Sequence, residues 1–321
     1  MQTKIVFILG PTSSGKTSVA IKLCREFNGE IVSADSRQVY KYLDIGTGKV
    51  PVGVKDMQIG KLANKDEPVC WEVDGVKVWM YDVVKPGEYF SAADFRELAE
   101  GRINDIWLRG KIPFVVGGTG FYIETLLGSK NLAIVVPNFK LRDNLEKLSA
   151  VELADKLRLL DLKRYEVIDK NNRRRLIRAV EIASSFGTAS TPQSLRVSGW
   201  RINQPLRLGL AAPHDFLYPR VDAWVEDSFR GGLVKETAGL IKMGFKNTPQ
   251  LQGLIYRTVL QHLAGSLKLE ETKQLIKYDL HSYIRRQETY FRKMADIKWL
   301  HIDSSAFDEE LHSSVKSYLN G

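Results

Sequence analysis

A glycine-rich loop near the N-terminus carries the residue types that hold a chain of phosphates. The loop reads GPTSSGKT from Gly10 to Thr17 and fits the pattern G-x-x-x-x-G-K-[ST]. It follows an apolar run at 5–9 and precedes a helical pattern at 18–27. In such loops the amides and the helix N-terminus face phosphate oxygens, Lys16 adds a full positive charge, and the Thr17 hydroxyl can ligate Mg²⁺. The pattern predicts a diphosphate or triphosphate site, and the alternative is a chance glycine loop.

A carboxylate at the end of the next apolar run is the second candidate group. Residues 30–35 read EIVSAD, a short β-rich run that ends in Asp35. The order strand, helix, strand favours parallel pairing, and open α/β sheets bind ligands at the carboxyl ends of their strands. We therefore expect Asp35 beside the phosphate loop, in a position to accept a proton. The alternative is a helix N-cap or a solvated turn carboxylate.

Features of a nucleotide hydrolase are weaker in this sequence. The best candidate for a metal-binding carboxylate at the end of a second strand is Asp82, which follows the apolar run 78–81, whereas the run 115–116 leads into glycines. No residue can be assigned to position a water for attack on a phosphate. The loop therefore predicts phosphate binding without specifying ATP.

Basic side chains concentrate in one segment of the chain. The chain has 47 Lys and Arg against 38 Asp and Glu, a net charge of +9, which favours a polyanionic partner. Seven of the basic residues lie between Lys163 and Arg178, against two acidic ones. On a helix Arg174 and Arg178 would repel each other unless an anion lay between them. We expect this segment to contact phosphates, and the alternative is a solvated helix face.

The composition excludes several classes of protein. Of 321 residues 44% are hydrophobic and 26% charged, which is typical of a globular protein with a sizeable core. Two cysteines cannot form a disulfide framework or a cysteine-rich zinc site, and the five histidines lack metal-ligand spacing. No apolar stretch approaches the roughly 18 residues of a membrane span or forms a signal-peptide core. We expect a cytoplasmic protein that is neither exported nor embedded in a membrane.

The elements that would position these groups alternate between strands and helices in the first part of the chain. Beyond the first two strands, strands are expected at 76–84, 113–116 and 206–210. Helices are expected at 91–108, with a capping box of Ser91 and Asp94, and then at 138–148, 151–160, 172–186, 216–244, 248–264 and 273–298. The predicted fold class is α/β, with a P-loop NTPase-like parallel sheet core flanked by helices, formed by residues 1–127 and 205–321. A mostly helical insertion domain is predicted at 128–204.

Longer motifs, in this order, closely resemble those of the tRNA dimethylallyltransferases. They are the phosphate loop, ADSRQVY at 34–40, GT at 46–47, SAADF at 91–95, VGGTG at 116–120, NRR at 172–174, RAVE at 178–181 and YIRRQ at 283–287. The resemblance covers nearly the whole chain, and the strings ADSRQVY and VGGTG are far more specific than the phosphate loop alone.

The resemblance implies transfer of a dimethylallyl group from dimethylallyl diphosphate to N6 of adenine 37 in tRNA, next to the anticodon. It implies that Asp35 is the general base and that Thr119 lies close to both substrates. The diphosphate and a Mg²⁺ cofactor, held through the Thr17 hydroxyl, would be bound by the loop and one arginine: Gly10, Pro11, Thr12, Ser13, Ser14, Gly15, Lys16, Thr17 and Arg220.

The resemblance also assigns residues to the tRNA anticodon stem-loop, which a monomer would bind. They are Asp35, Ser36, Arg37 and Gln38 around the adenine, with Thr119, Arg142, Arg174, Arg175, Leu176, Ile177, Arg178, Gly253, Leu254, Ile255, Tyr256, Arg257 and Thr258. The chain departs from the family pattern at Ile255, where glycine is usual, at Trp224, where a second arginine is common, and at Trp79 with Met80, near which the family often has histidine.

Two other functions fit part of these observations. A P-loop kinase of small molecules would share the loop and could use Asp35 for a substrate hydroxyl, but it leaves the basic helical insertion unexplained. A non-catalytic RNA-binding module explains the charge but not Lys16, Thr17 and Asp35 together. Label transfer to tRNA from dimethylallyl diphosphate, compared with label transfer from ATP, distinguishes the three functions.

Overall fold

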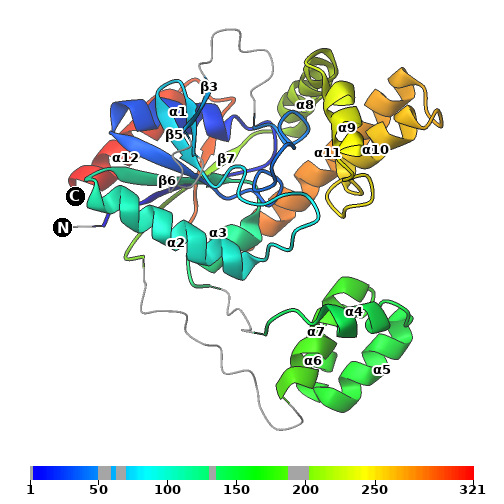
Figure 1. The fold of residues 1–321 in the computed structure, drawn as a ribbon. Helices are drawn as coiled ribbons and strands as arrows, with labels where there is room; N and C mark the ends of the chain where they lie inside the picture. The colour runs from blue at the N-terminus through cyan, green and yellow to red at the C-terminus, as the bar shows by residue number, and fades with distance from the viewer. Residues whose placement is uncertain (1–2, 50–58, 63–69, 130–134, 187–201) are drawn as a thin grey trace. The chain divides into compact units, whose positions relative to one another are not determined.

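The computed structural model describes residues 3–49, 59–62, 70–129, 135–186 and 202–321. Its centre is an eight-stranded sheet with the order β3-β4-β5-β2-β6-β1-β7-β8 (Figure 1). The strands are β1 Val6–Leu9, β2 Gly29–Ser33, β3 Ile59–Leu62, β4 Cys70–Val73, β5 Val76–Trp79, β6 Ile112–Gly117, β7 Leu206–Ala211 and β8 Lys298–His301. All pair in parallel except β3 with β4 and β4 with β5. The predicted α/β fold class is confirmed.

The central strands are apolar because both of their faces are covered. Every residue of β1 and β2 is buried, as in parallel sheets that carry helices on both faces. Helices α1 (Lys16–Glu26) and α12 (Phe307–Asn320) lie on one face, and α2 (Ala92–Leu108) lies on the other (Figure 1). Ser91 and Asp94 form the expected capping box at the start of α2.

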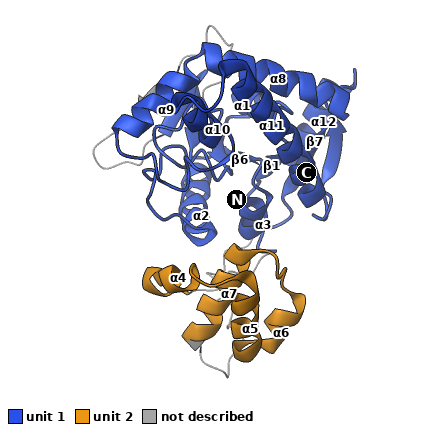
Figure 2. Cartoon of the chain, turned by 90° about the vertical axis from the view of Figure 1, so that its right-hand side faces the viewer, with its two compact units in different colours: residues 1–129, 201–321 blue, residues 130–200 orange. Residues whose placement is uncertain are grey.

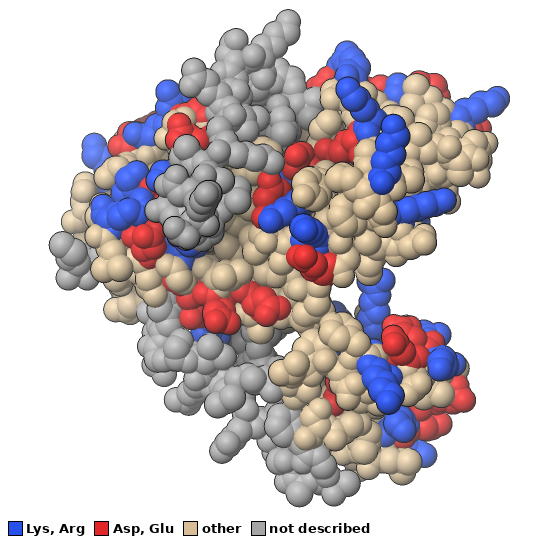
Figure 3. All heavy atoms as spheres, in the orientation of Figure 1, with Lys and Arg blue, Asp and Glu red and all other residues tan. Residues whose placement is uncertain are grey.

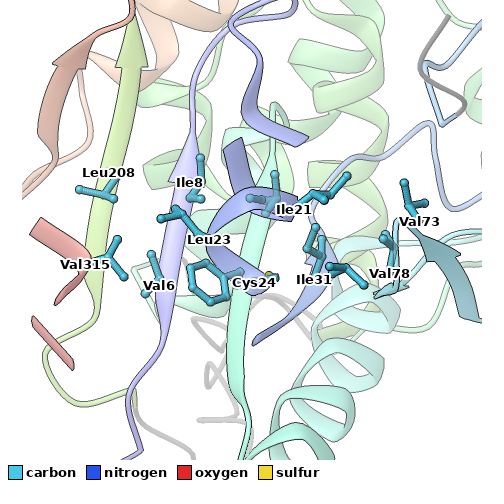
Figure 4. Close-up of a cluster of buried hydrophobic side chains, with 14 of the residues drawn as sticks. Val6, Ile8, Ile21, Leu23, Cys24, Ile31, Val73, Val78, Leu208 and Val315 are labelled. Atoms are coloured by element: carbon cyan, nitrogen blue, oxygen red, sulfur yellow. The ribbon is translucent and has the colours of Figure 1, made fainter. Parts of the chain in front are cut away.

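One core cluster joins α1 and α12 to the sheet (Figure 4). Val6 and Ile8 of β1 and Ile31 of β2 meet Leu23 of α1, and Val315 of α12 packs in the same cluster. These side chains are each no more than 2% exposed. The packing fixes the direction of α1, so that the phosphate loop, which joins β1 to α1, lies at the carboxyl end of β1.

The remaining helices follow β6 and β7. They are α3 Gly120–Leu126, α8 His214–Arg230, α9 Leu233–Lys242, α10 Leu254–Leu263 and α11 Leu269–Phe291. The single helix expected at 216–244 is wrong, since α8 ends at Arg230 and Gly232, with φ 103°, separates it from α9. The helix expected at 248–264 begins only at Leu254. None of the helices described is long and apolar enough to cross a membrane.

Two further expectations are corrected at the ends of elements. The long helix expected at 273–298 stops at Phe291, and Lys298–His301 forms β8 beside β7, with Leu300 buried. Asp296, with φ 56°, lies in the turn between them. The strand expected at 76–84 ends at Trp79, because the backbone turns at Met80 (φ 71°).

The chain divides into two compact units (Figure 2). Unit 1 contains residues 1–129 and 201–321, and unit 2 contains residues 130–200. Unit 2 has the helices α4 Phe139–Leu145, α5 Ala150–Leu160, α6 Leu162–Val167 and α7 Arg173–Phe186. Its core contains Leu153, Leu157, Leu176 and Val180, each fully buried, so this unit has a hydrophobic core of its own.

Candidate active site

The phosphate loop joins β1 to the N-terminus of α1 in a conformation that leaves the helix amides uncapped. Gly15 has a left-handed backbone (φ 80°), and no side chain caps the helix. Ser13 also has a positive φ, 64°, which is uncommon outside glycine. The hydroxyl of Ser14 is buried and has no hydrogen-bond partner within the described structure. Uncapped amides, the helix dipole and an unsatisfied hydroxyl together favour an anionic ligand.

Lys16 folds back over this loop. Its Nζ donates to the carbonyl of Pro11 at 2.6 Å. Burial lowers the pKa of Lys16 to about 8, and the nearby carboxylate of Asp35 offsets part of that shift. A bound anion would favour the charged form of the amine, so this side chain is suited to meet phosphate oxygens.

Arg220 approaches the loop from α8. Its Nε donates to the carbonyl of Ser13 at 3.0 Å, and its Nη2 lies 3.6 Å from the position that a Cβ at Gly15 would occupy. Trp224, one turn further along α8, lines the same cavity. The arginine that reaches the loop is therefore Arg220. Although Trp224 stands where the family commonly has a second arginine, α8 still supplies the loop with a cation.

Gln287 of α11 fixes the loop from the other side. Its Oε1 accepts from the backbone N–H of Thr12 at 2.9 Å and from the Thr12 hydroxyl at 3.2 Å. Its Nε2 donates to the carbonyl of Gly118 at 3.0 Å. One buried amide thus links the phosphate loop to the loop that follows β6.

Asp35 begins a turn directly after β2. Its Oδ1 accepts from the backbone N–H of Arg37 at 2.8 Å, which holds the turn 35–37. The backbone N–H of Ser36 donates to the hydroxyl of Thr119 at 3.0 Å. A Cβ at Gly117 would lie 2.2 Å from the carbonyl oxygen of Ala34, so only glycine permits β2 and β6 to approach this closely here. The ADSRQ and VGGTG strings therefore meet at one edge of the sheet.

A cavity of about 480 Å³ connects the loop, the Asp35 turn and the start of α10. Its lining contains half of the site residues assigned from the sequence: Thr12, Ser13, Gly15, Lys16, Thr17, Asp35, Ser36, Arg37, Gln38, Gly253, Leu254, Ile255 and Tyr256. Thr119 borders it through Ser36. A hydroxyl, a carboxylate and a cation thus converge in one cavity, beside apolar walls that include Trp224 and Leu280.

Known proteins match this chain over most of its length. A family model described as IPP transferase matches residues 38–294, and one described as isopentenyl transferase matches residues 3–56. The tRNA dimethylallyltransferase of Acetivibrio thermocellus is 37% identical over 98% of this chain and 97% of its own, and that of Anoxybacillus flavithermus is 32% identical over 100% and 97%. The chain belongs to the tRNA dimethylallyltransferase family. The resemblance inferred from the motifs is confirmed.

Solved structures of relatives have the same fold. The full-length tRNA isopentenylpyrophosphate transferase of Bacillus halodurans superposes with a TM-score of 0.67 at 32% identity, covering 99% of this chain and 97% of its own. A eukaryotic dimethylallyltransferase, described as acting on tRNA, gives a TM-score of 0.78 at 25% identity, covering 99% of this chain and 80% of its own. Family membership thus extends over the P-loop-like core and the insertion, and it makes the protein a prenyltransferase.

The arginines of unit 2 divide into two groups in this family member. Glu181, whose side chain is fully buried, accepts from Arg142 (Nε at 2.9 Å and Nη2 at 2.7 Å) and pairs with Arg178. Burial alone would raise the pKa of Glu181, but these hydrogen bonds lower it. No anion is therefore needed between Arg174 and Arg178, which corrects that step of the sequence argument. Arg174 and Arg175 are exposed.

Other residues assigned to tRNA lie in the protein interior. Leu176 and Ile177 are 0% and 4% exposed in the core of unit 2, so their side chains do not form an RNA surface. Thr258 is 2% exposed and its hydroxyl bonds back to the carbonyl of Leu254. Arg257 is exposed and pairs with Asp279 at 3.4 Å. Figure 3 shows Lys and Arg interspersed with Asp and Glu over the drawn face of unit 2.

Asp82, considered from sequence as a metal ligand, has a different role. Its carboxylate accepts from Lys49 at 2.7 Å and from the indole N–H of Trp71 at 3.0 Å. Both partners are almost completely buried. Asp82 is therefore part of a buried polar network and is not among the residues lining the cavity.

The sequence argument did not single out several residues that line the cavity as site residues. They are Ser18, Ile31, Ser33, Gly46, Thr47, Gly48, Tyr81, Val116, Gly117, Gly118, Trp224, Leu280 and Tyr283. Of these, Gly46, Thr47, Val116, Gly117, Gly118 and Tyr283 belong to motifs that carry the family resemblance. Trp224 and Leu280 come from α8 and α11 and reach the cavity through tertiary packing, which no local spacing reports.

Proposed function

We propose that the protein transfers the dimethylallyl group of dimethylallyl diphosphate to N6 of adenine 37, next to the anticodon of a tRNA. The observation that carries the proposal is the single cavity that joins an anion-binding loop to a carboxylate turn. An enzyme that transfers phosphoryl groups would need the phosphate loop, but it would not need space beside the loop for an unstacked nucleotide base. The names of the relatives support a prenyl donor and a tRNA acceptor.

The loop Gly10–Thr17 and Arg220 are the proposed diphosphate site. Lys16 and Arg220 converge there with the uncapped N-terminus of α1 and the unpaired hydroxyl of Ser14. Negative charge grows on the bridging oxygen as the allylic C–O bond stretches. The cations and amides that converge on the loop would stabilise this charge on the leaving group.

The same site fits a magnesium ion. Mg²⁺ prefers oxygen ligands and is commonly bound through one or two protein oxygens together with substrate phosphates. The Thr17 hydroxyl and the Asp35 carboxylate both line the cavity. The described residues contain no group of three or more His, Cys, Asp or Glu side chains that could hold a metal ion without the substrate. Thr17 would hold the ion, which would supply charge neutralisation for the departing diphosphate.

Asp35 is the proposed general base. The adenine N6 attacks the allylic carbon, the carbon–oxygen bond to the diphosphate breaks, and the N6 proton passes to the Asp35 carboxylate. A base can reach this cavity only if it leaves its stack, and Ser36, Arg37 and Gln38 line the space where it would be held. Arg37 extends across Gly253 to the carbonyl of Gln250 at 3.2 Å, which orders this side of the cavity.

Unit 2 is proposed to contact the anticodon stem-loop through exposed cations. Arg174 and Arg175 are exposed at the start of α7 and are suited to phosphate contacts. Arg142 and Arg178 are held by Glu181, so the proposal places the phosphate contacts on the exposed pair.

A label-transfer assay tests the proposal. The protein is incubated with Mg²⁺, unfractionated tRNA and either dimethylallyl diphosphate labelled in the allyl group or ATP labelled in the γ-phosphate. We expect acid-precipitable label only from the prenyl donor, and nuclease digestion should locate it on N6 of the adenosine 3′ of the anticodon. Label from ATP would indicate a kinase, and tight tRNA binding without transfer from either donor would indicate a non-catalytic RNA-binding module.

A further inference from the structure

A carboxylate outside the cavity holds one of its walls. Glu236 lies in α9 and is not among the lining residues. Its Oε2 accepts from the backbone N–H groups of Asp44 at 3.0 Å and Ile45 at 2.7 Å, and its Oε1 accepts from that of Gly46 at 3.2 Å. Three successive amides thus converge on one ionised side chain, which is the strong class of hydrogen bond.

The same carboxylate also binds the wall supplied by α10. The hydroxyl of Tyr256 donates to Oε1 of Glu236 at 2.7 Å. Burial, together with the charge of Glu236, raises the pKa of Tyr256, so this hydroxyl remains a donor. A Cβ at Gly46 would lie 2.6 Å from Cζ of Tyr256, so the ring packs directly on the turn. Glu236 therefore joins two walls of the cavity that come from distant parts of the chain.

The turn held by Glu236 leads to a residue of the acceptor side. The carbonyl of Thr47 accepts from Nε2 of Gln38 at 3.1 Å, and the Ser33 hydroxyl donates to Oε1 of Gln38 at 2.8 Å. The orientation of the Gln38 amide thus depends on where the 44–47 turn lies. The phosphate loop is fixed by other residues, Gln287 and Arg220.

We propose that Glu236 is a positioning residue for the nucleotide acceptor. It fixes the 44–47 turn, which holds Gln38 through the Thr47 carbonyl, together with Tyr256, and it leaves the diphosphate side unaffected. This inference rests on the proposed function, because it names the side of that cavity on which Glu236 acts. The proposal predicts that loss of Glu236 lowers kcat/KM for tRNA alone, whereas a general loss of structure would weaken the binding of both substrates.

The test compares Glu236→Gln with Glu97→Gln, a matched change at an exposed position of α2. Glutamine keeps one acceptor oxygen but turns an NH₂ group toward the amides. We expect kcat/KM for tRNA to fall roughly ten- to fiftyfold, on the scale of one or two lost charged hydrogen bonds. The Kd for dimethylallyl diphosphate should stay within twofold of wild type, and Glu97→Gln should change neither value.

Two further variants keep the inference testable if Glu236→Gln does not fold. Gly46→Ala leaves Glu236 intact but drives a Cβ into Tyr256, and it should reproduce the loss for tRNA alone. Tyr256→Phe keeps the ring and removes one donor, so it should give a smaller loss of about threefold to tenfold. When Tyr256→Phe is combined with Glu236→Gln, the total loss should be less than the product of the two single losses.

Three results would overturn the inference or the proposal beneath it. A folded Glu236→Gln or Gly46→Ala protein with tRNA kinetics within twofold of wild type would overturn the role of Glu236. An equal loss of donor affinity would overturn its restriction to the acceptor side. If the wild-type protein transfers no dimethylallyl group to tRNA, the proposed function fails, and this control separates that failure from the other two.

Discussion

The side-chain amide of Gln287 lies 2.9 Å from the backbone nitrogen of Thr12, so α11 holds the phosphate loop across 275 residues of chain. The amide is oriented, because its NH₂ group donates to Gly118 while its oxygen accepts from Thr12. A carboxylate cannot donate to Gly118, and an apolar side chain leaves both backbone groups unsatisfied. The contact therefore requires a side chain that is donor and acceptor at once.

We predict that Gln287→Leu weakens binding of dimethylallyl diphosphate more than binding of tRNA. Two buried backbone groups lose their partner, at about 1 to 3 kcal/mol each, so the Kd for the donor should rise at least tenfold. Isothermal titration with the donor measures it, with the exposed Tyr278→Phe on the same helix as control. Equal Kd values in the two variants would show that the loop keeps its shape without α11.

Lys16 should make donor affinity dependent on pH. Because the pKa of Lys16 is lowered to about 8, its ammonium form is lost as pH rises through 8, which is the form that binds diphosphate. Above that pH the Kd should rise roughly tenfold per pH unit until the pKa of the complex is reached. Lys16→Arg stays charged in this range and should give a flat profile between pH 8 and 10. A wild-type Kd that is constant over the same range contradicts this prediction.

Replacement of Asp35 by Asn separates proton transfer from positioning. The Asn oxygen can still accept from the N–H of Arg37, so the turn should persist while the ability to take a proton is lost. We expect the single-turnover rate to fall about 10²- to 10⁴-fold, which is roughly 3 to 5 kcal/mol. Donor affinity should be nearly unchanged, and Asp143→Asn, exposed on α4, serves as control. A rate within tenfold of wild type would mean that Asp35 only orients the base.

The two groups of arginines in unit 2 should respond differently to substitution. Arg174 and Arg175 are exposed, so changing both to Gln should reduce the salt-dependence slope of tRNA binding by roughly 1.4 to 1.8 and leave stability unchanged. Arg178→Gln removes one of two cations from the buried Glu181, so it should destabilise unit 2 by about 1.5 to 3 kcal/mol. Salt titrations of tRNA binding and thermal unfolding measure the two effects. The prediction is contradicted if the Arg174 and Arg175 changes destabilise unit 2 while Arg178→Gln alters only the salt dependence.

The parts of the site that the sequence predicted are those built from neighbouring residues. The phosphate loop and the Asp35 turn each lie in one short string, in which strand, glycine and helix patterns follow one another. Glu236 and Gln287 act on segments about 190 and 275 residues away, and no local spacing reports such contacts. The pairing of Arg178 with Glu181 could be predicted from the sequence, because the two residues are three apart on one helix, a spacing that permits an ion pair.

The fold shows the same division. The buried strand β1 is a continuous apolar run, and β6 contains the apolar run Phe114 to Val116, whereas β8 has one buried residue, Leu300, and its Lys298 extends the basic pattern of the preceding helix. Its strand conformation depends on pairing with β7, which a local pattern does not contain. The break between α8 and α9 carried a signal, Gly231 followed by Gly232, which the apolar spacing on either side obscured.

Among the described strands, β1 is synthesised longest before both of its pairing partners. β1 lies between β6 and β7, so its partners leave the ribosome about 100 and 200 residues after it. At about 5 to 20 residues per second, β7 appears roughly 10 to 40 s later. During that interval a fully apolar strand has one or both edges open, and such edges are where chains pair wrongly. The nascent chain should therefore need a chaperone most before residue 211 is made, and a ribosome stalled earlier should expose β1 to proteases.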